Sequence, residues 1–217
     1  MSERAKILTM AVSGLLLVAV AVVIVAARSG DDDLPPASSP AQAETKDIKL
    51  DEPDEVVKPG EPASVTMETT EGSFTIELDT ERAPVTANNF AYLTEKRFYD
   101  GLGFHRIVPG FVIQGGDPQG NGTGDPGYKV TERPPSDLEY APGVVAMAKG
   151  GDEQPGTSGS QFFVVTGSGG SSLPPEYALV GEVTEGMDVV NEIGELGGSD
   201  EQPTRSVVIK KATLQKG

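Results

Sequence analysis

The chain of 217 residues is long enough for one ordinary domain with an appended segment, and 37% of its residues are hydrophobic, which allows a core of conventional size. Its formal net charge of −16, with no basic cluster interleaved with aromatic residues, argues against a nucleic-acid partner. Because it has no cysteine, one histidine and no acidic calcium loop, we expect no disulfide, no metal and no cofactor.

An uncharged apolar run occupies residues 7–27, near the start of the chain. At ~1.5 Å per residue it is long enough to cross a ~30 Å hydrocarbon layer once as a helix. Arg4 and Lys6 precede it and three aspartates follow it, so the positive-inside rule places residues 1–6 in the cytoplasm and the remainder outside. The sequence therefore predicts a single-pass protein of the cell membrane with an extracytoplasmic domain.

A cleaved signal peptide is the alternative interpretation of this run, with Val25-Ala26-Ala27 as a small-residue cleavage site. The apolar region of a signal peptide ordinarily has ~7 to 15 residues, and this run is longer, which favours an uncleaved anchor. Cleavage would make the protein secreted, so both interpretations export the rest of the chain.

Residues 28–62 differ in composition from the segments on either side. They are rich in Asp, Glu, Pro, Ala and Ser and show no apolar periodicity, which is typical of a disordered linker. We expect this linker to hold a domain of residues 63–217 away from the membrane.

Short strands and two helices are predicted within residues 63–217. Alternating polar and apolar residues at 64–69 and 73–78 predict a β-hairpin, and Pro84 begins a partly amphipathic helix that ends near Arg97. Gly, Pro and Asp dominate residues 117–142, which indicates a loop. Further strands are expected at 144–148, 162–166, 177–183 and 206–214, and a short helix at 187–193. This pattern predicts a mainly β fold, a closed barrel capped at its ends.

The stretch from Phe104 to Gly116 is the strongest candidate for a functional site. Two β-prone runs flank Pro109-Gly110, a dipeptide that marks a tight turn. Alternation along these strands places Arg106 and Gln114 on, or beside, the face that carries Phe104. That face would combine a cation, an amide and apolar surface, although a strand pair whose polar residues are merely solvated fits the spacing equally well.

A series of short motifs runs in order through residues 63–215. The motifs are Phe104-His105-Arg106-Ile107, Pro109-Gly110-Phe111, Gln114-Gly115-Gly116-Asp117, Gly122-Thr123-Gly124, Met147-Ala148, Gly159-Ser160-Gln161-Phe162-Phe163, and Gly181 with Gly186-Met187. Together they resemble the cyclophilin family of peptidyl-prolyl cis-trans isomerases, here a bacterial membrane-anchored or exported form. The resemblance implies an eight-stranded antiparallel barrel closed by two helices and proline-containing polypeptides as substrates. Nothing in the sequence indicates more than a monomer.

The resemblance also implies which residues form the site. Arg106 corresponds to the family's catalytic arginine, Gln114 to its substrate-orienting glutamine, and Phe111 lies beside them in the pocket for the proline ring. The remaining implied substrate-binding residues are Val112, Ala148, Lys149, Gln161, Phe163, Leu173 and Tyr177.

Four positions depart from the pattern of the animal members. Val112 replaces a methionine, Lys149 an asparagine, Tyr177 a histidine and Ser172 a tryptophan. That tryptophan is a main contact for the inhibitor cyclosporin in the family. We therefore expect weak cyclosporin binding with retained activity.

The resemblance implies an isomerase that stabilises a twisted X-Pro amide through Arg106 and assists the folding of exported or cell-surface proteins. Three other functions are compatible with parts of the sequence. A serine hydrolase with His105 as base is disfavoured, because Gly-x-Ser-x-Gly does not occur. A phosphate-binding loop at residues 115–127 lacks Gly-Lys-Ser/Thr and a following helix. A proline-peptide-binding chaperone or scaffold with little catalytic activity remains the alternative.

Overall fold

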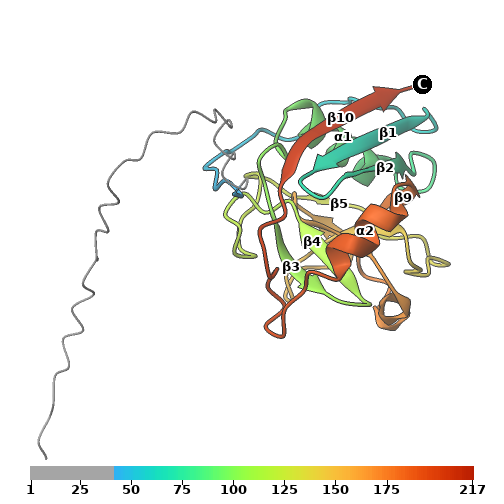
Figure 1. Cartoon of the computed structure of the whole chain (residues 1–217). Helices are drawn as coiled ribbons and strands as arrows, with labels where there is room; N and C mark the ends of the chain where they lie inside the picture. Colours follow the sequence, from blue (N-terminus) through green and yellow to red (C-terminus); the bar gives the residue numbers. More distant parts are fainter. Residues whose placement is uncertain (1–41) are drawn as a thin grey trace, which may run out of the picture. The chain divides into compact units, whose positions relative to one another are not determined.

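The structure, a computed structural model, describes residues 42–217, and eight strands of this part form one antiparallel sheet in the order β10-β1-β2-β9-β6-β8-β4-β3 (Figure 1). These strands are β1 (Ala63–Thr69), β2 (Ser73–Leu78), β3 (Phe104–Val108), β4 (Val112–Gly115), β6 (Val144–Met147), β8 (Phe162–Val165), β9 (Leu179–Glu185) and β10 (Ile209–Lys216). The other elements are β5 (Val130–Thr131), which pairs with β7 (Thr157–Ser158), and the helices α1 (Pro84–Glu95), α2 (Met187–Gly194) and η1 (Ser168–Ser172), a 3₁₀ helix.

The predicted hairpin and both predicted helices are confirmed. α1 begins at Pro84, where proline has no helical hydrogen bond to lose, and it buries Ala87, Phe90 and Ala91 at helical spacing. It ends before Arg97, whose φ of 56° is not helical. The loop predicted at 117–142 contains β5, a two-residue strand that is too short to produce a periodic pattern.

Alternation along the central strands gives the sheet two apolar faces. Ile113, Val145, Phe162 and Val164 point to an inner face and join the main core. Their neighbours Val112, Ala146, Phe163 and Val165 point to an outer face and form a second, smaller cluster. Because successive side chains of a strand point to opposite sides, the continuous apolar runs of β6 and β8 and the apolar pair Val112-Ile113 of β4 supply both faces.

The sheet is curled but open, so the prediction of a closed barrel is wrong. β3 and β10 form its two edges, and among residues 42–217 no strand ladder joins them, although the residues just before these strands form an isolated bridge between Gly103 and Val208. The reason is that the chain between α2 and β10 covers the free edge of β3 in place of a strand. The Phe104 amide donates to the Val207 carbonyl at 3.0 Å, and the Ile107 amide donates to the Glu201 carbonyl at 2.8 Å. A loop thus satisfies the edge that a paired strand would have satisfied.

Residues 42–62, the described part of the predicted linker, pack against the domain. Val57 is 2% exposed and belongs to the main core, and the amides of Val56 and Val57 donate to Oδ1 of Asn88 on α1 at 2.7 and 3.0 Å. The Leu50 amide donates to the Pro126 carbonyl at 2.7 Å. The boundary predicted at residue 63 therefore lies inside the folded unit, because a few spaced apolar residues suffice to hold an acidic segment on the surface.

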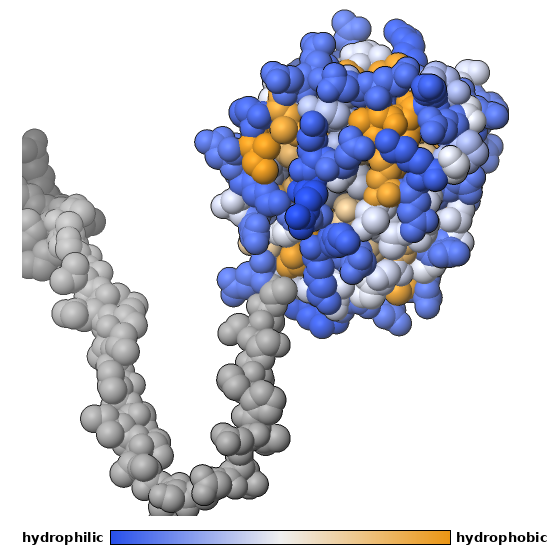
Figure 2. Space-filling model, turned by 90° about the horizontal axis from the view of Figure 1, so that it is seen from above, coloured by the Kyte–Doolittle hydropathy of each residue, from blue (hydrophilic) through white to orange (hydrophobic). Residues whose placement is uncertain are grey.

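Within residues 42–217 no helix has both the length and the apolar character needed to cross a membrane. The apolar run predicted to do so, residues 7–27, lies outside the described residues. On the face drawn in Figure 2, hydrophilic residues surround small and separate hydrophobic patches. Val85 is the one large hydrophobic residue that is exposed in the described part of the chain.

We expect Val57→Ala to lower the free energy of unfolding by about 2 kcal/mol, because two buried methyl groups are lost and a small cavity remains. Val85→Ala makes the same chemical change at a residue that is 45% exposed, and should alter stability by less than about 0.5 kcal/mol. Chemical denaturation of both variants of the full chain tests this. Equal, small changes would show that Val57 contributes no core burial.

Candidate active site

The β3–β4 hairpin carries the two polar residues that the sequence singled out. Its turn is tight, with Gly110 at a φ of +70°. The strand register shifts between Phe104 and Arg106, which makes His105 the extra residue of a β-bulge. Phe104 consequently points into the main core, whereas Arg106 lines the outer face. Of the two expected placements of Arg106, on the face of Phe104 or beside it, the first is wrong, because it assumed regular alternation along β3.

Arg106, Gln114, Phe163 and Ala146 form a row across four neighbouring strands. Arg106 pairs with Gln114 between β3 and β4, Gln114 with Phe163 between β4 and β8, and Phe163 with Ala146 between β8 and β6. Side chains paired in this way have Cβ atoms ~4.5–5.5 Å apart on the same face. Backbone pairing therefore sets the spacing between the guanidinium, the amide and the aromatic ring.

A pocket of about 210 Å³ opens at this row. Aromatic and aliphatic side chains form most of its wall, and Arg106 and Gln114 contribute hydrogen-bond donors to it. The structure brings together nine of the ten predicted site residues: Arg106, Phe111, Val112, Gln114, Ala148, Lys149, Phe163, Leu173 and Tyr177. Their individual roles stay predictions.

The tenth residue, Gln161, lies in the adjoining hollow, which shares three wall residues with the pocket. Gln114 Nε2 donates to Gln161 Oε1 at 3.2 Å. Gln161 Nε2 donates in turn to the carbonyls of Gly122 and Gly124 at 3.0 and 2.9 Å. This series of hydrogen bonds fixes the amide of Gln114 at the pocket edge from the side of the glycine-rich loop.

Arg106 has two neighbours that orient its long side chain. Its Nε donates to Glu201 Oε2 at 2.7 Å, and its Cζ lies 5.9 Å from the centroid of the Phe111 ring. The side chain is 32% exposed, so the guanidinium borders both the pocket and solvent. The sequence did not predict Glu201 as a partner, because nothing in a turn residue 95 positions away indicates this contact.

Three aromatic rings brace the far wall of the pocket. Phe163 and Tyr177 meet edge to face with centroids 5.3 Å apart, and Tyr140 packs against both. The Tyr140 hydroxyl donates to the Tyr177 carbonyl at 2.8 Å and accepts from the Tyr177 amide at 3.0 Å. Burial raises the pKa of Tyr140 from its ordinary value of 10.0 to about 12, so the hydroxyl remains a donor over a wider pH range. Tyr140 was missed, and its only sequence signal is an aromatic residue inside a Gly- and Pro-rich loop.

Lys149 holds two loops together at the same wall. Its side chain is 6% exposed, with Nζ 3.2 Å from Glu176 Oε2 and donating to the Glu153 carbonyl at 3.2 Å. The same Nζ lies 5.9 Å from the centroid of the Tyr177 ring. The ammonium group is thus occupied by protein partners. Ser172, at the end of η1, donates to the Gly169 carbonyl at 2.7 Å and is not part of the pocket wall.

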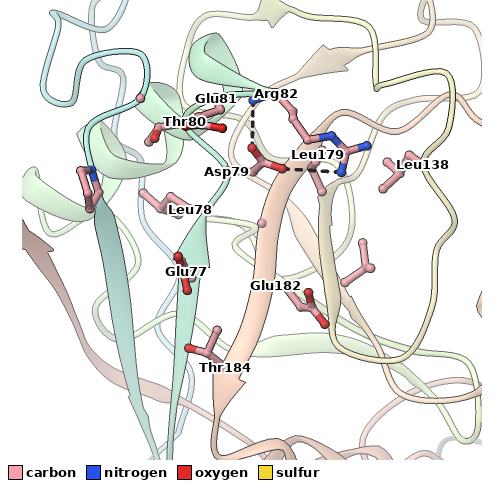
Figure 3. A pocket seen from close by; sticks show the side chains of 14 residues that line it. Glu77, Leu78, Asp79, Thr80, Glu81, Arg82, Leu138, Leu179, Glu182 and Thr184 are labelled. Atoms are coloured by element: carbon pink, nitrogen blue, oxygen red, sulfur yellow. Dashed lines mark hydrogen bonds and ion pairs between the residues drawn. The ribbon is translucent and has the colours of Figure 1, made fainter.

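A second hollow lies between the ends of β2 and β9 and shares no lining residue with the pocket (Figure 3). Its wall contains Glu77, Asp79, Glu81 and Glu182 but no aromatic residue. Arg82 is already engaged there, because its amide donates to Asp79 Oδ1 at 2.8 Å and its Nη1 lies 3.8 Å from Asp79 Oδ2. Apolar side chains such as Leu78, Leu138 and Leu179 also line this hollow, but among the described residues its one basic side chain, Arg82, is paired with Asp79 and Asp137.

The described fold is therefore a curled antiparallel sheet whose outer face carries a small, largely apolar pocket with a cation and an amide in its wall. The family model described as "Cyclophilin type peptidyl-prolyl cis-trans isomerase/CLD" matches residues 64–214. The chain belongs to this family and is an isomerase of the cyclophilin type.

Proteins similar to this chain are found in several different organisms. Peptidyl-prolyl cis-trans isomerase-like 1 of Gibberella zeae is 39% identical over 156 residues, which cover 70% of this chain and 94% of that protein. Peptidyl-prolyl cis-trans isomerase A of Mycobacterium tuberculosis is 37% identical over 171 residues, covering 70% and 92%. A crystal structure of a Cryptosporidium parvum cyclophilin-type isomerase in the presence of the dipeptide Ala-Pro has a TM-score of 0.65, with 29% identity and coverage of 71% and 99%.

His105, the bulge residue, has both ring nitrogens buried without a hydrogen-bond partner among residues 42–217. Burial lowers its pKa below the ordinary value, a shift that the Asp117 carboxylate opposes and the charge of Arg106 reinforces. As the pH falls, His105 therefore becomes protonated at a higher pH in the unfolded chain than in the folded chain. Stability is complete above the unfolded pKa of about 6.5 and is lost as the pH falls through the folded value.

We expect the free energy of unfolding to decrease from about pH 7 to about pH 5.5, with a slope below about 1.4 kcal/mol per pH unit. His105 is the chain's only histidine, and the carboxylates with lowered pKa, such as Asp125 and Glu153, act at lower pH. His105→Phe should abolish the slope, since neither ring nitrogen of His105 makes a hydrogen bond within residues 42–217. Denaturant titrations at several pH values measure this slope. A free energy of unfolding that does not change with pH in the wild type would contradict a buried, neutral imidazole.

Proposed function

We propose that this chain catalyses cis-trans isomerisation of X-Pro bonds by stabilising the twisted amide with Arg106. The observation that carries the proposal is the row of Arg106, Gln114 and Phe163, which sets a donor-only cation and an amide against an aromatic ring beside a small pocket. The Ala-Pro dipeptide used with the Cryptosporidium parvum relative supports proline-containing peptides as substrates.

The reaction breaks no bond. Rotation about an X-Pro amide removes its resonance, with a barrier of ~18–20 kcal/mol, and the spontaneous step takes tens to hundreds of seconds. In the twisted state the nitrogen becomes pyramidal and can accept a hydrogen bond. A catalyst therefore needs a group that interacts more strongly with the twisted amide than with the planar one.

A guanidinium meets this requirement, because it is planar, always charged and has only donors. Nε of Arg106 is engaged with Glu201, which leaves the Nη groups to donate to the amide nitrogen or to hold the rotating carbonyl. Phe111, Val112 and Phe163 seat the proline ring, and Gln114, oriented through Gln161, holds the flanking backbone.

The required stabilisation is moderate. An increase from ~0.01 per second to the ~10² to 10³ per second of ordinary enzymes corresponds to 10⁴- to 10⁵-fold, or about 5.5 to 7 kcal/mol. Charge-assisted donation in a site partly removed from water supplies energies of this size.

Arg106→Ala should lower kcat by about 10²-fold or more, the usual effect of removing one donor to a transition state, while peptide affinity is partly retained. Arg106→Lys keeps the charge but loses the planar guanidinium, so its kcat should lie between those of the wild type and Arg106→Ala. Line-shape or exchange NMR of an Ala-Pro peptide measures both the isomerisation rate and the peptide affinity of each variant. Unchanged isomerisation by Arg106→Ala would reject the assignment.

A peptide-binding scaffold with little catalysis is the second candidate. Lys149, Tyr177 and Ser172 favour it in so far as they depart from the family pattern. Yet Lys149 directs its charge to Glu176, and Tyr177 still packs on Phe163, so neither departure fills the pocket. Ser172 contributes no ring to the wall, and weak cyclosporin binding stays a prediction.

We also propose that residues 7–27 anchor the protein in the cell membrane, so that the isomerase assists the folding of exported or cell-surface proteins. The uncharged composition of this run and the charges on either side support the proposal.

The anchor predicts that the protein purified from membranes of expressing bacteria has the mass of a chain that still contains residues 7–27. Intact-mass spectrometry of the mature protein decides this. A mass that lacks the first 27 residues would show cleavage and favour secretion.

A further inference from the structure

The loop between α2 and β10 places one carboxylate on the guanidinium of Arg106. Glu201 accepts from Arg106 Nε at 2.7 Å through its side chain and from the Ile107 amide at 2.8 Å through its carbonyl. The second contact attaches the loop to β3 one residue beyond Arg106. The position of the carboxylate is therefore set by the same strand edge that carries the arginine.

The backbone at Glu201 is in an unfavourable conformation. Its φ is 62°, in the left-handed region that glycine adopts easily and a residue with a side chain does not. The loop imposes this angle through hydrogen bonds from the Gly198 amide to the Gln202 carbonyl at 2.8 Å and from the Glu201 amide to the Gly198 carbonyl at 3.1 Å. A strained residue beside a reactive group is a reason to look for a role of its side chain.

The donors of Arg106 are only partly occupied. An arginine has one Nε–H and four Nη–H donors. Within residues 42–217 the Nη groups make no hydrogen bond, and only Nε is taken. A carboxylate that blocked the site would cover the Nη groups as well, so the contact restrains the guanidinium without consuming the donors that face a substrate.

We propose that Glu201 is a positioning residue, which holds the guanidinium plane of Arg106 at the pocket edge and leaves its Nη groups for the twisted amide. This inference rests on the proposed role of Arg106. Without the contact, a long and partly exposed side chain samples other rotamers, and the fraction of time spent in the productive orientation falls. The orientation of the guanidinium matters only for its contact with the twisted amide. Loss of Glu201 should therefore change kcat but not the binding of the ground-state peptide.

Two variants of the full chain separate positioning from stability. Glu201→Gly removes the carboxylate and relieves the positive φ, so the protein should melt at a higher temperature while kcat falls about three- to fivefold, the upper part of the range expected for losing one exposed ion pair. Glu201→Gln keeps an oxygen acceptor for Nε and the same backbone strain, and should retain kcat within about twofold with unchanged melting. KM for an Ala-Pro peptide should stay the same in both.

A matched control removes the same charge elsewhere. Glu192 is an exposed residue of α2 that makes no ion pair within residues 42–217, and Glu192→Gln should leave kcat and KM at their wild-type values. The NMR signal of the Arg106 Nε–H reports the contact directly. It should move toward the free-arginine position in Glu201→Gly and remain near its original position in Glu201→Gln.

The outcomes distinguish this inference from the role of Arg106 itself. If Arg106→Ala loses activity but Glu201→Gly keeps or exceeds the wild-type kcat, Glu201 does not position the arginine. The same conclusion follows if the Nε–H signal is unaffected by Glu201→Gly. If Arg106→Ala is fully active, the proposed role of Arg106 fails and the inference about Glu201 fails with it.

Discussion

The site depends on the register in which β3, β4, β8 and β6 pair. This register places Arg106, Gln114, Phe163 and Ala146 in one row on the outer face. A shift of one residue in any of these strands would turn its side chains to the opposite face. The bulge at His105 is a local shift of this kind, since it lets Phe104 remain in the core while Arg106 faces the pocket. At this bulge the His105 imidazole is buried without a hydrogen-bond partner among residues 42–217, so we expect the stability of the protein to depend on pH.

The open edge of the sheet has a functional consequence. Because a loop and not a strand covers β3, the residues of that loop are free to carry side chains toward the outer face, and Glu201 does so. A closed ladder would have placed alternating strand residues there instead. The arginine is thus held from the strand on one side and from the loop on the other, while the three aromatic rings and the buried Lys149 stiffen the opposite wall.

Features that depend on residues close together in the sequence were predicted, whereas contacts between residues far apart in the sequence were not. The helices, the hairpin and nine of the pocket residues were predicted, because local patterns and family motifs carry them. The bulge at His105 was not, since regular alternation is the default for a strand. Tyr140 and Glu201 act across long sequence separations and look like ordinary loop residues. Residues 42–62 were predicted to be a linker because most of them are polar or charged. The single fully buried residue of this segment, Val57, does not produce a recognisable apolar pattern.

The most direct test of the account is the rate at which cis and trans forms of an Ala-Pro peptide interconvert while bound to the wild-type chain. Exchange NMR at saturating peptide separates this rate from binding. We predict interconversion at least about 10⁴-fold faster than the spontaneous step of tens to hundreds of seconds. Peptide signals that shift on binding while interconversion stays at the spontaneous rate would contradict the account and identify the outer-face pocket as a binding site without catalysis.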